Sequence, residues 1–180
     1  MTLAEFLDWE NRQDQRHEFV GGEVFAMVGA RRVHGLCSGN VFASLKQQLR
    51  GTPCRAFMSD MKLQTADDTL FYPDVFVTCD PADLRTELVF RAPTVVVEVL
   101  SPSTEAVDRG LKFAHYRRLA SLQEYLLVDP DLRRMELFRR GADGLFTLHD
   151  AADGAITLDS IGCALAADVV FEDLDGEPAA

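Results

Sequence analysis

Two carboxylates interrupt apolar, strand-like runs of the sequence. Glu98 lies within the run Val95 to Leu100, and Asp74 follows Pro73 in the run Phe71 to Val77. A carboxylate in such a run must either be desolvated at a large free-energy cost or be satisfied by a metal or a cation. If the two runs form neighbouring strands, the carboxylates can converge, and carboxylate oxygens are the ligands that Mg²⁺ prefers. These residues are therefore the first candidates for a metal site.

Each carboxylate also has a purely structural interpretation. Glu98 is alternatively an edge-facing surface glutamate, and Asp74 is alternatively part of a Pro-Asp turn at a strand start. A third interpretation makes both of them satisfied carboxylates of the core, in which case Asp74→Ala and Glu98→Ala chiefly destabilise the fold.

Residues on predicted helices are candidates to complete such a site. His34 follows Arg31 and Arg32 at a predicted helix start, where backbone N–H groups favour phosphate, so it is either a phosphate contact or a histidine of the cap region. Tyr116 lies four residues after Lys112 and shares its helix face. A packed core tyrosine is the alternative for Tyr116, and a solvated surface lysine is the alternative for Lys112.

The elements that must position these residues alternate between helical and strand-like patterns. The sequence predicts a capped helix from Thr2, a hairpin around Gly21-Gly22, helices over residues 33–49 and 105–119, strands over 54–58 running on towards 63, 70–77, 94–100 and 124–129, an edge strand over 133–140, and short β pieces at 145–148 and 155–158. The strand, helix, strand crossover implies parallel pairing within a mixed sheet. We therefore expect an α/β fold with a central mixed β-sheet flanked by helices, an N-terminal β-hairpin and an acidic C-terminal β extension.

The composition is that of a single domain. The chain has 180 residues, of which 47% are hydrophobic and 26% charged, enough to bury a core without staples. We expect one domain over residues 1–174 and a disordered tail over 175–180. The longest uncharged apolar stretch, residues 92–97, is far shorter than the ~20 residues of a membrane span, and the acidic N-terminus does not resemble a signal peptide. These features favour a cytoplasmic location and exclude a membrane segment.

The cysteines and the charge distribution constrain the function less. The four cysteines contain no C-x-x-C pair, so we expect reduced core thiols rather than a zinc site. The net charge of −11 is unevenly distributed, because residues 141–180 hold nine acidic residues and no Lys or Arg. The first 140 residues hold 18 basic and 20 acidic residues, a net charge of only −2. The acidic whole-chain charge therefore does not decide whether a polyanion binds.

A series of motifs in a specific order spans roughly residues 2–170. They are Glu18–Glu23, His34, Ser59-Asp60, Tyr72–Val75, Val96–Thr104, Asp108, Lys112–Arg118 and Ser121–Asp129. Together they resemble the PD-(D/E)xK nuclease superfamily and, within it, the Uma-type restriction endonuclease family. The resemblance implies a restriction-endonuclease-like core and a metal-dependent endonuclease that hydrolyses phosphodiester bonds, with DNA as the substrate.

The same resemblance assigns roles to individual residues. It makes Asp74 and Glu98 the two acids that hold Mg²⁺ or Mn²⁺. The motif lysine normally follows the second acid by two residues, but that position is Leu100 in this chain. Lys112 on the following helix is the matching candidate for the third catalytic residue, and Lys62 is its competitor.

Further residues of the family pattern have supporting roles. Glu23 or Glu18 would supply an outer acid, with ordinary hairpin surface charge as the alternative for both, and His34 and Tyr116 are the other supporting candidates. A basic cluster on the second long helix would form part of a DNA groove; its members are Arg109, Lys112, His115, Arg117 and Arg118.

Two wider expectations complete the sequence-based interpretation. The resemblance and an apolar edge near residues 128–137 predict a homodimer. Leu100 and the acidic charge favour an alternative function, a catalytically inactive nuclease-fold module that binds nucleic acid or a protein partner. Retention of Asp74, Glu98 and Lys112 argues against that alternative.

Overall fold

A computed structural model describes residues 1–27, 29–151 and 154–175. Its helices are α1 (Leu3–Glu10), α2 (Arg32–Gln48), α3 (Glu105–Val107), α4 (Phe113–Tyr116) and α5 (Ala167–Val170), with a 3₁₀ turn at Asp83–Arg85 and a π-helical turn at Asp108–Lys112. Its strands are β1 (His17–Val20), β2 (Glu23–Ala26), β3 (Arg55–Met58), β4 (Lys62–Ala66), β5 (Thr69–Phe71), β6 (Val75–Thr78), β7 (Val89–Phe90), β8 (Pro93–Val99), β9 (Glu124–Asp129), β10 (Arg134–Arg140), β11 (Phe146–Ala151), β12 (Ala155–Leu158) and β13 (Cys163–Ala166). Most of the predicted tail, residues 176–180, lies outside the described residues.

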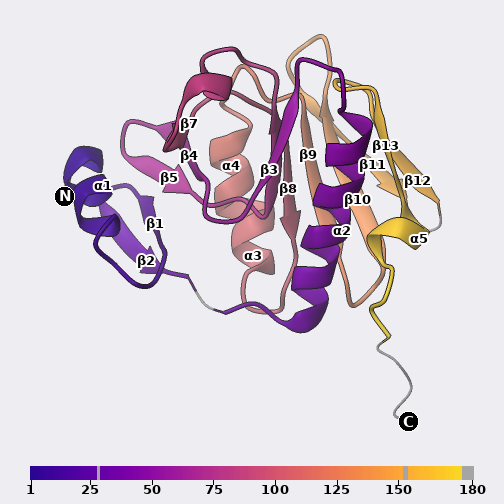
Figure 1. Cartoon of the computed structure of the whole chain (residues 1–180), viewed down its shortest axis with the longest axis horizontal. Helices are drawn as coiled ribbons and strands as arrows, with labels where there is room; N and C mark the ends of the chain where they lie inside the picture. Colours follow the sequence, from indigo (N-terminus) through magenta and orange to yellow (C-terminus); the bar gives the residue numbers. More distant parts are fainter. Residues whose placement is uncertain (28, 152–153, 176–180) are drawn as a thin grey trace.

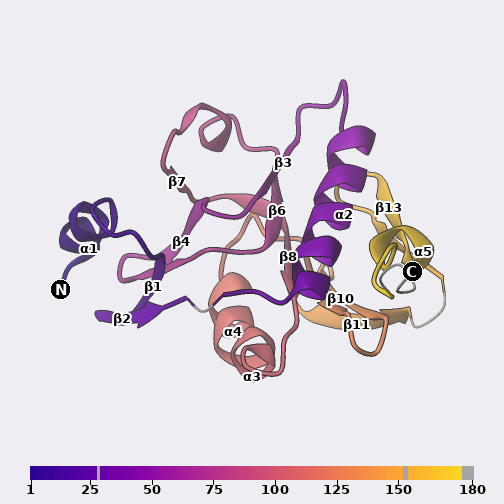
Figure 2. The same ribbon diagram turned by 60° about the horizontal axis from the view of Figure 1, so that its bottom comes forward.

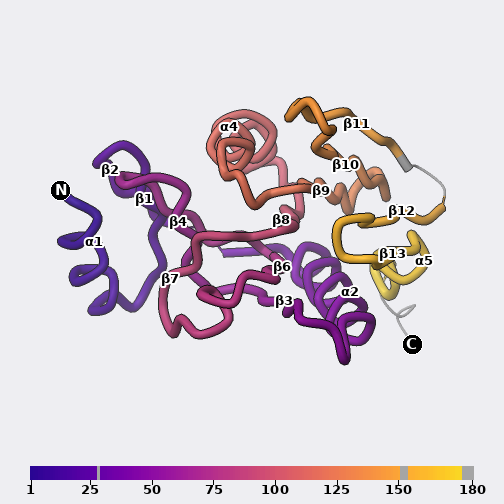
Figure 3. The backbone as a smooth tube through the Cα atoms, turned by 90° about the horizontal axis from the view of Figure 1, so that it is seen from above, coloured from indigo at the N-terminus to yellow at the C-terminus, as the bar shows by residue number. Residues whose placement is uncertain are grey.

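The central element is a six-stranded mixed sheet in the order β11-β10-β9-β8-β6-β3. Its β8 and β9 strands pair in parallel, joined by the helical crossover α3–α4, and the other neighbours are antiparallel. Helix α2 covers one face and the α3–α4 segment covers the other (Figure 3). The α/β fold predicted from the sequence is therefore confirmed.

Alternation along the central strands builds two cores, one on each face. Val75, Val95 and Val97 pack with residues of α2, whereas Phe76 and Val96 pack on the opposite face with residues of α4. Successive side chains of a strand point to opposite faces, so the unbroken apolar run in β8 reflects burial on both sides.

A second, five-stranded sheet in the order β2-β1-β5-β4-β7 carries the N-terminal part of the chain. Helix α1 begins with the predicted capping box, formed by Thr2 and Glu5, and packs against β1 through Phe6 and Phe19. Figure 1 shows α1, β1 and β2 at one end of the molecule and β12, β13 and α5 at the other. The predicted N-terminal hairpin and C-terminal β extension are both present.

Two predicted continuous strands are each divided between the two sheets. The strand expected over 54–63 breaks at Ser59 and Asp60, whose φ angles of 34° and 57° are incompatible with an extended strand. The strand expected over 70–77 breaks at Tyr72–Asp74, where Pro73 lacks the N–H that a ladder requires. The prediction that each of these strands is continuous was wrong, because turn geometry overrode the apolar pattern. The second break places Asp74 immediately before β6.

The edge strand predicted over 133–140 is also corrected. Strand β10 lies inside the sheet, between β9 and β11. Its partner β11 forms an antiparallel hairpin with it, so β11 is the edge instead. Val128 and Leu137 are almost completely buried within the chain, so these two residues do not form the exposed apolar edge that supported the predicted homodimer.

The helix predicted over 105–119 is shorter and less regular than expected. It ends at Tyr116 and consists of α3, the π-helical turn and α4. A π turn inserts an extra residue into a helix and is frequent at functional sites.

The cysteines differ from the prediction in one pair. Cys54 and Cys79 form a disulfide, whereas Cys37 and Cys163 are free and buried as predicted. Cys54 precedes Arg55 and Cys79 follows Thr78, and Arg55 pairs with Thr78 in the β3–β6 register, so the two cysteines occupy the next opposing positions. Among the described residues, no helix is both long and apolar enough to cross a membrane.

Candidate functional site

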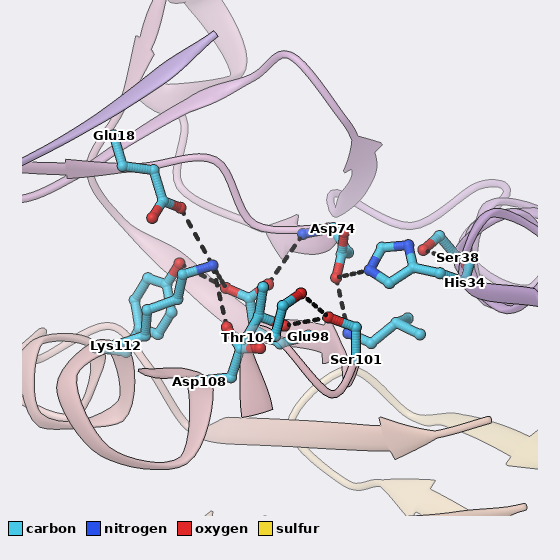
Figure 4. Close-up of polar contacts among 12 residues, drawn as sticks. Glu18, His34, Ser38, Asp74, Glu98, Ser101, Thr104, Asp108 and Lys112 are labelled. Carbon is cyan, nitrogen blue, oxygen red and sulfur yellow. Dashed lines mark hydrogen bonds and ion pairs between the residues drawn. The ribbon is translucent and has the colours of Figure 1, made fainter. Parts of the chain in front are cut away.

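Asp74 and Glu98 meet where β6 and β8 lie side by side. These strands pair antiparallel with Val75 opposite Val97, so Asp74 and Glu98 occupy the next opposing positions. The backbone N–H of Val99 donates to Asp74 Oδ2 at 2.7 Å, and the N–H of Asp74 donates to Glu98 Oε2 at 3.4 Å. The reciprocal contacts fix both carboxylates at one end of the two strands (Figure 4).

Lys112 reaches the same cluster from the helical segment. Its Nζ lies 3.3 Å from Glu98 Oε1, 3.2 Å from Glu18 Oε1 and 3.2 Å from Asp108 Oδ1. Glu18 comes from β1 of the other sheet, so the cluster joins three elements that are distant in sequence (Figure 4). Tyr116 donates its O–H to Glu98 Oε1 at 2.9 Å.

The π-helical turn determines how Lys112 is presented. Asp108 and Lys112 are its first and last residues, and both are buried. The Tyr125 hydroxyl donates to the Asp108 backbone oxygen at 2.8 Å, which ties the turn to β9. Tyr116, one turn further along, points at the same carboxylate as Lys112 because residues four apart share a helix face.

Burial and mutual repulsion dominate the electrostatics of the cluster. Burial, together with the negative charges of Asp108, Asp74 and Glu18, raises the pKa of Glu98 well above its ordinary value, although Lys112 opposes this. Burial lowers the pKa of Lys112, but the surrounding carboxylates, Glu98 first, outweigh it and hold that pKa well above its ordinary value. Lys112 is therefore a cation at neutral pH.

His34 extends the cluster on the side of α2. Its Nε2 lies 3.3 Å from Asp74 Oδ2, close to the N-terminus of the helix (Figure 4). Burial lowers the pKa of His34, but the hydrogen bond and charge of Asp74 outweigh this and leave the pKa above its ordinary value. The side chain is thus directed at the carboxylate, and a phosphate contact by His34 would compete with Asp74.

The structure brings together most of the residues predicted from the sequence. Asp74, Glu98, Lys112, His34 and Tyr116 all lie in or beside one cluster.

Two predicted candidates lie elsewhere. Glu23 is exposed on β2 and does not line the cavity of the cluster, whereas its alternative Glu18 does. Lys62, the competing lysine, is buried in the five-stranded sheet with its Nζ 5.6 Å from the Tyr72 ring centre. Leu100, at the position of the motif lysine, is buried in the core beside α4.

Asp108 is the residue to which the sequence assigned no role. Its carboxylate is almost fully buried and pairs with Lys112. The sequence feature that could have identified Asp108 is its spacing from Lys112, since an acid four residues before a lysine on a predicted helix is a typical ion-pair arrangement. The predicted basic cluster is only partly available for a DNA groove. Arg109 pairs with Glu105 and Glu136, whereas Arg117 and Arg118 are exposed.

The cluster lies in a cavity of about 690 Å³. The cavity is lined by carboxylates of the cluster and by apolar side chains of the hairpin, the loops before β6 and after β8, and the helical segment. A volume of this size is in the range of small-molecule and cofactor sites.

Comparison with known proteins gives consistent matches over almost the whole chain. The profile of the Uma2 family, described as "Putative restriction endonuclease", matches residues 3–168. The uncharacterized protein slr1290 of Synechocystis sp. is 39% identical over 176 residues, covering 97% of this chain and 93% of that protein. A second uncharacterized Synechocystis protein, sll1609, is 32% identical over 153 residues, covering 83% and 86% of the two chains.

A solved structure shares the fold. The crystal structure described as a "putative nuclease belonging to DUF820" from Anabaena variabilis superimposes with a TM-score of 0.73 at 19% identity, covering 95% of this chain and 97% of that one. This structure shows the shared fold, and the family description supports a nuclease function in general. The chain belongs to the Uma2 family of restriction-endonuclease-like proteins.

Proposed function

We propose that this protein is a metal-dependent endonuclease that hydrolyses phosphodiester bonds of DNA, with Asp74, Glu98 and Lys112 as its catalytic residues. The observation that carries the proposal is the convergence of these three side chains, from β6, β8 and the helical segment, at one end of the central sheet. A cytoplasmic location and a homodimer, both expected from the sequence, belong to the same proposal.

The donor set suits a hard divalent cation. Asp74 Oδ1 has no hydrogen-bond partner among the described residues, and Glu98 Oε2 has only the long contact to the N–H of Asp74. Four carboxylates surround a single lysine and a histidine, which leaves an excess of negative charge for a cation to balance. Asp74 and Glu98 would hold Mg²⁺ or Mn²⁺.

The rest of the coordination shell would come from outside the protein. In the described part of the chain, no group of three or more His, Cys, Asp or Glu side chains is arranged to hold a metal. Mg²⁺ commonly binds through one or two carboxylates and keeps waters and phosphate oxygens as its other ligands. When bound, such a cation polarises a phosphoryl oxygen and lowers the pKa of a bound water.

Lys112 has a defined role in this reaction. Because its pKa is raised, it stays protonated at neutral pH and cannot accept a proton from the attacking water. Its ammonium would instead donate to the phosphate and stabilise the negative charge that develops on it in the transition state. Glu18 and Asp108 hold the ammonium in place, and Tyr116 fixes the orientation of the Glu98 carboxylate.

The test combines calorimetric titration of Mn²⁺ with a plasmid-nicking assay on the same samples. We expect Asp74→Asn and Glu98→Gln to remain folded and to lose both Mn²⁺ binding and nicking. Lys112→Met should keep Mn²⁺ binding and lose nicking by about 100-fold or more, the usual effect of removing a group that stabilises transition-state charge. Glu87→Gln, at an exposed position away from the cavity, is the control.

Each result separates the enzyme from its alternatives. Unchanged metal affinity in Asp74→Asn or Glu98→Gln contradicts the proposed metal ligands. Metal binding without nicking in the wild-type protein favours the inactive binding module. A general loss of folding in both variants favours two carboxylates with a purely structural role.

A further inference from the structure

An exposed aromatic side chain stands directly beside the catalytic cluster. Phe25 on β2 is paired with Glu18 on β1, and directly opposed residues of an antiparallel pair point to the same face. Glu18 contacts Lys112. The Phe25 side chain lines the same cavity and is 48% exposed, so it lies at the entrance to the site.

The helical segment supplies a second apolar surface to this cavity. Val107 and Leu111 are 39% and 43% exposed, and both line the cavity. Leu111 immediately precedes Lys112, so this surface also adjoins the catalytic cluster. The hairpin and the helical segment are far apart in sequence, with α2 and strands β3 to β8 between them (Figure 2). Large exposed apolar side chains from both of them therefore surround a floor of carboxylates.

The cations of the cavity lining are already engaged within the chain. Lys112 contacts three carboxylates, His34 contacts Asp74, and the Arg31 guanidinium binds both carboxylate oxygens of Asp131 at 2.8 and 3.0 Å. Over the described residues, the lining holds no other Lys, Arg or His. Duplex DNA is bound largely through many cationic contacts to phosphates, whereas this cavity, with Arg31 and His34 paired, offers only the Lys112 ammonium for a phosphate.

We infer that the cavity takes an unstacked nucleobase of single-stranded nucleic acid, with Phe25 as the stacking platform and Val107 and Leu111 as the second apolar contact. Aromatic side chains stack on any base, because every base has a π face. The inference rests on the proposed function, since it names the substrate class of the same site. A duplex would enter only where a base is frayed or extruded from the stack.

Fluorescence anisotropy tests this with a short fluorescein-labelled single-stranded DNA, measured with Ca²⁺ in place of Mg²⁺ and Mn²⁺. Base–aromatic stacking is worth about 1–3 kcal/mol per base, so Phe25→Ala should weaken binding by about fivefold or more. Phe25→Trp should retain the wild-type affinity because it keeps a stacking surface. Leu111→Ala, in the second apolar surface, should weaken binding as well.

The control is Leu148→Ala on β11, which removes an equally exposed apolar side chain, 49% exposed, outside the cavity lining. A duplex of the same sequence should bind more weakly than the single strand. An oligonucleotide with abasic sites should bind wild type and Phe25→Ala alike, since it has no base to stack.

Three outcomes overturn the inference: unchanged affinity of folded Phe25→Ala, tighter binding of the duplex, or no binding of any oligonucleotide by the wild-type protein. None of them decides the proposed function, which the Mn²⁺ titration and the nicking assay test separately. Nicking that depends on Asp74 but not on Phe25 would leave the endonuclease standing and remove the stacking platform.

Discussion

The buried, acidic surroundings of Glu98 favour the chemistry of the site at the expense of the stability of the fold. Its carboxylate is 2% exposed and lies among three other carboxylates, with Lys112 and the Tyr116 hydroxyl as its main compensation. Buried carboxylates with strongly shifted pKa values are common at functional sites, where stability is given up for reactivity. The consequence is a measurable dependence of folding stability on pH.

Glu98→Gln should stabilise the metal-free protein at neutral pH. Since the pKa of Glu98 is raised in the folded state, the unfolded chain releases this proton at lower pH than the folded protein, so Glu98 lowers the folding stability as pH rises above its ordinary pKa of 4.5. Glutamine carries no such charge and still accepts a hydrogen bond from Tyr116. Urea unfolding in EDTA should show a gain of at least about 1 kcal/mol at about pH 8 and almost none at about pH 4.

The matched control is Glu136→Gln, a largely buried glutamate on β10 that pairs with Arg109 and Arg134 outside the cluster. Breaking its ion pairs should lower stability rather than raise it. Destabilisation by Glu98→Gln at about pH 8 would contradict the account of the cluster as a site of unfavourable charge.

At the scale of elements, the π-helical turn is the device that brings Asp108 and Lys112 into the cluster. Gly110 lies inside this turn, and a Cβ added there would meet nothing within 4 Å. Its φ is not in the left-handed region, so the position does not require glycine for backbone geometry.

Gly110→Ala should therefore raise the free energy of unfolding by about 0.4–1 kcal/mol, because alanine restricts the unfolded chain without straining the helix. Thermal unfolding measures this gain, and nicking should be unaffected. Gly39→Ala is the control within the regular helix α2, where an added Cβ also meets nothing within 4 Å. A gain at Gly39 with a loss at Gly110 would indicate that the π turn itself needs glycine.

The disulfide joins β3 and β6 at the end of the pair away from Asp74, because Cys54 precedes β3 and Cys79 follows β6, whereas Asp74 precedes β6. Cys54 and Cys79 close a segment of 25 residues, and closing a segment of this order stabilises a fold by about 3 kcal/mol in the chain-entropy account. Iodoacetamide labelling of the unfolded, unreduced protein should modify two cysteines, Cys37 and Cys163, and labelling after reduction should modify four. Reduction should also lower the melting temperature. Four labelled cysteines without reductant would restore the sequence-based prediction of reduced thiols.

At the scale of the whole molecule, the acidic C-terminal segment lies apart from the cavity. The acidic C-terminal segment is fastened to α2, with Arg32 donating to the backbone oxygens of Asp173 and Leu174 and Asn40 donating to those of Val170 and Glu172. Its strands β12 and β13 lie at the end of the molecule away from the N-terminal hairpin that carries Phe25 (Figure 1). The nine acidic residues of positions 141–180 therefore repel a polyanion at long range without lining the cavity.

This charge distribution predicts that binding of single-stranded DNA depends weakly on salt. Few cations line the cavity, and added salt also screens the repulsion by the acidic chain. Anisotropy titrations over a range of NaCl concentrations should give a slope of log K against log [NaCl] shallower than about −2, the value for roughly three phosphate contacts to a single strand. A slope typical of about 6–10 phosphate contacts would reveal a basic surface outside the cavity.

The predicted homodimer is also a property of the whole molecule. The apolar edge that suggested it is buried inside the sheet, where Val128 and Leu137 are core residues. The expectation now rests on the family resemblance alone, and light scattering at high protein concentration tests it.

The sequence by itself determined the residue types and the local elements. Asp74 and Glu98 were identifiable because a charged group inside an apolar run is costly to bury unless a partner compensates it. The caps, turns and helical periods of α1, β1–β2 and α2 were identifiable because they are local properties of the chain. The mixed sheet followed from the strand, helix, strand pattern, whose handedness and pairing are strongly constrained.

Only the tertiary structure decided which groups meet. The choice of Glu18 over Glu23, of Lys112 over Lys62, and the role of Asp108 depended on how β1 and the π-helical turn face β8. The pairing of Cys54 with Cys79 and the inner position of β10 depended on strand register and sheet order in the same way. These outcomes are set by long-range packing, for which spacing along the chain gives no measure of distance in space.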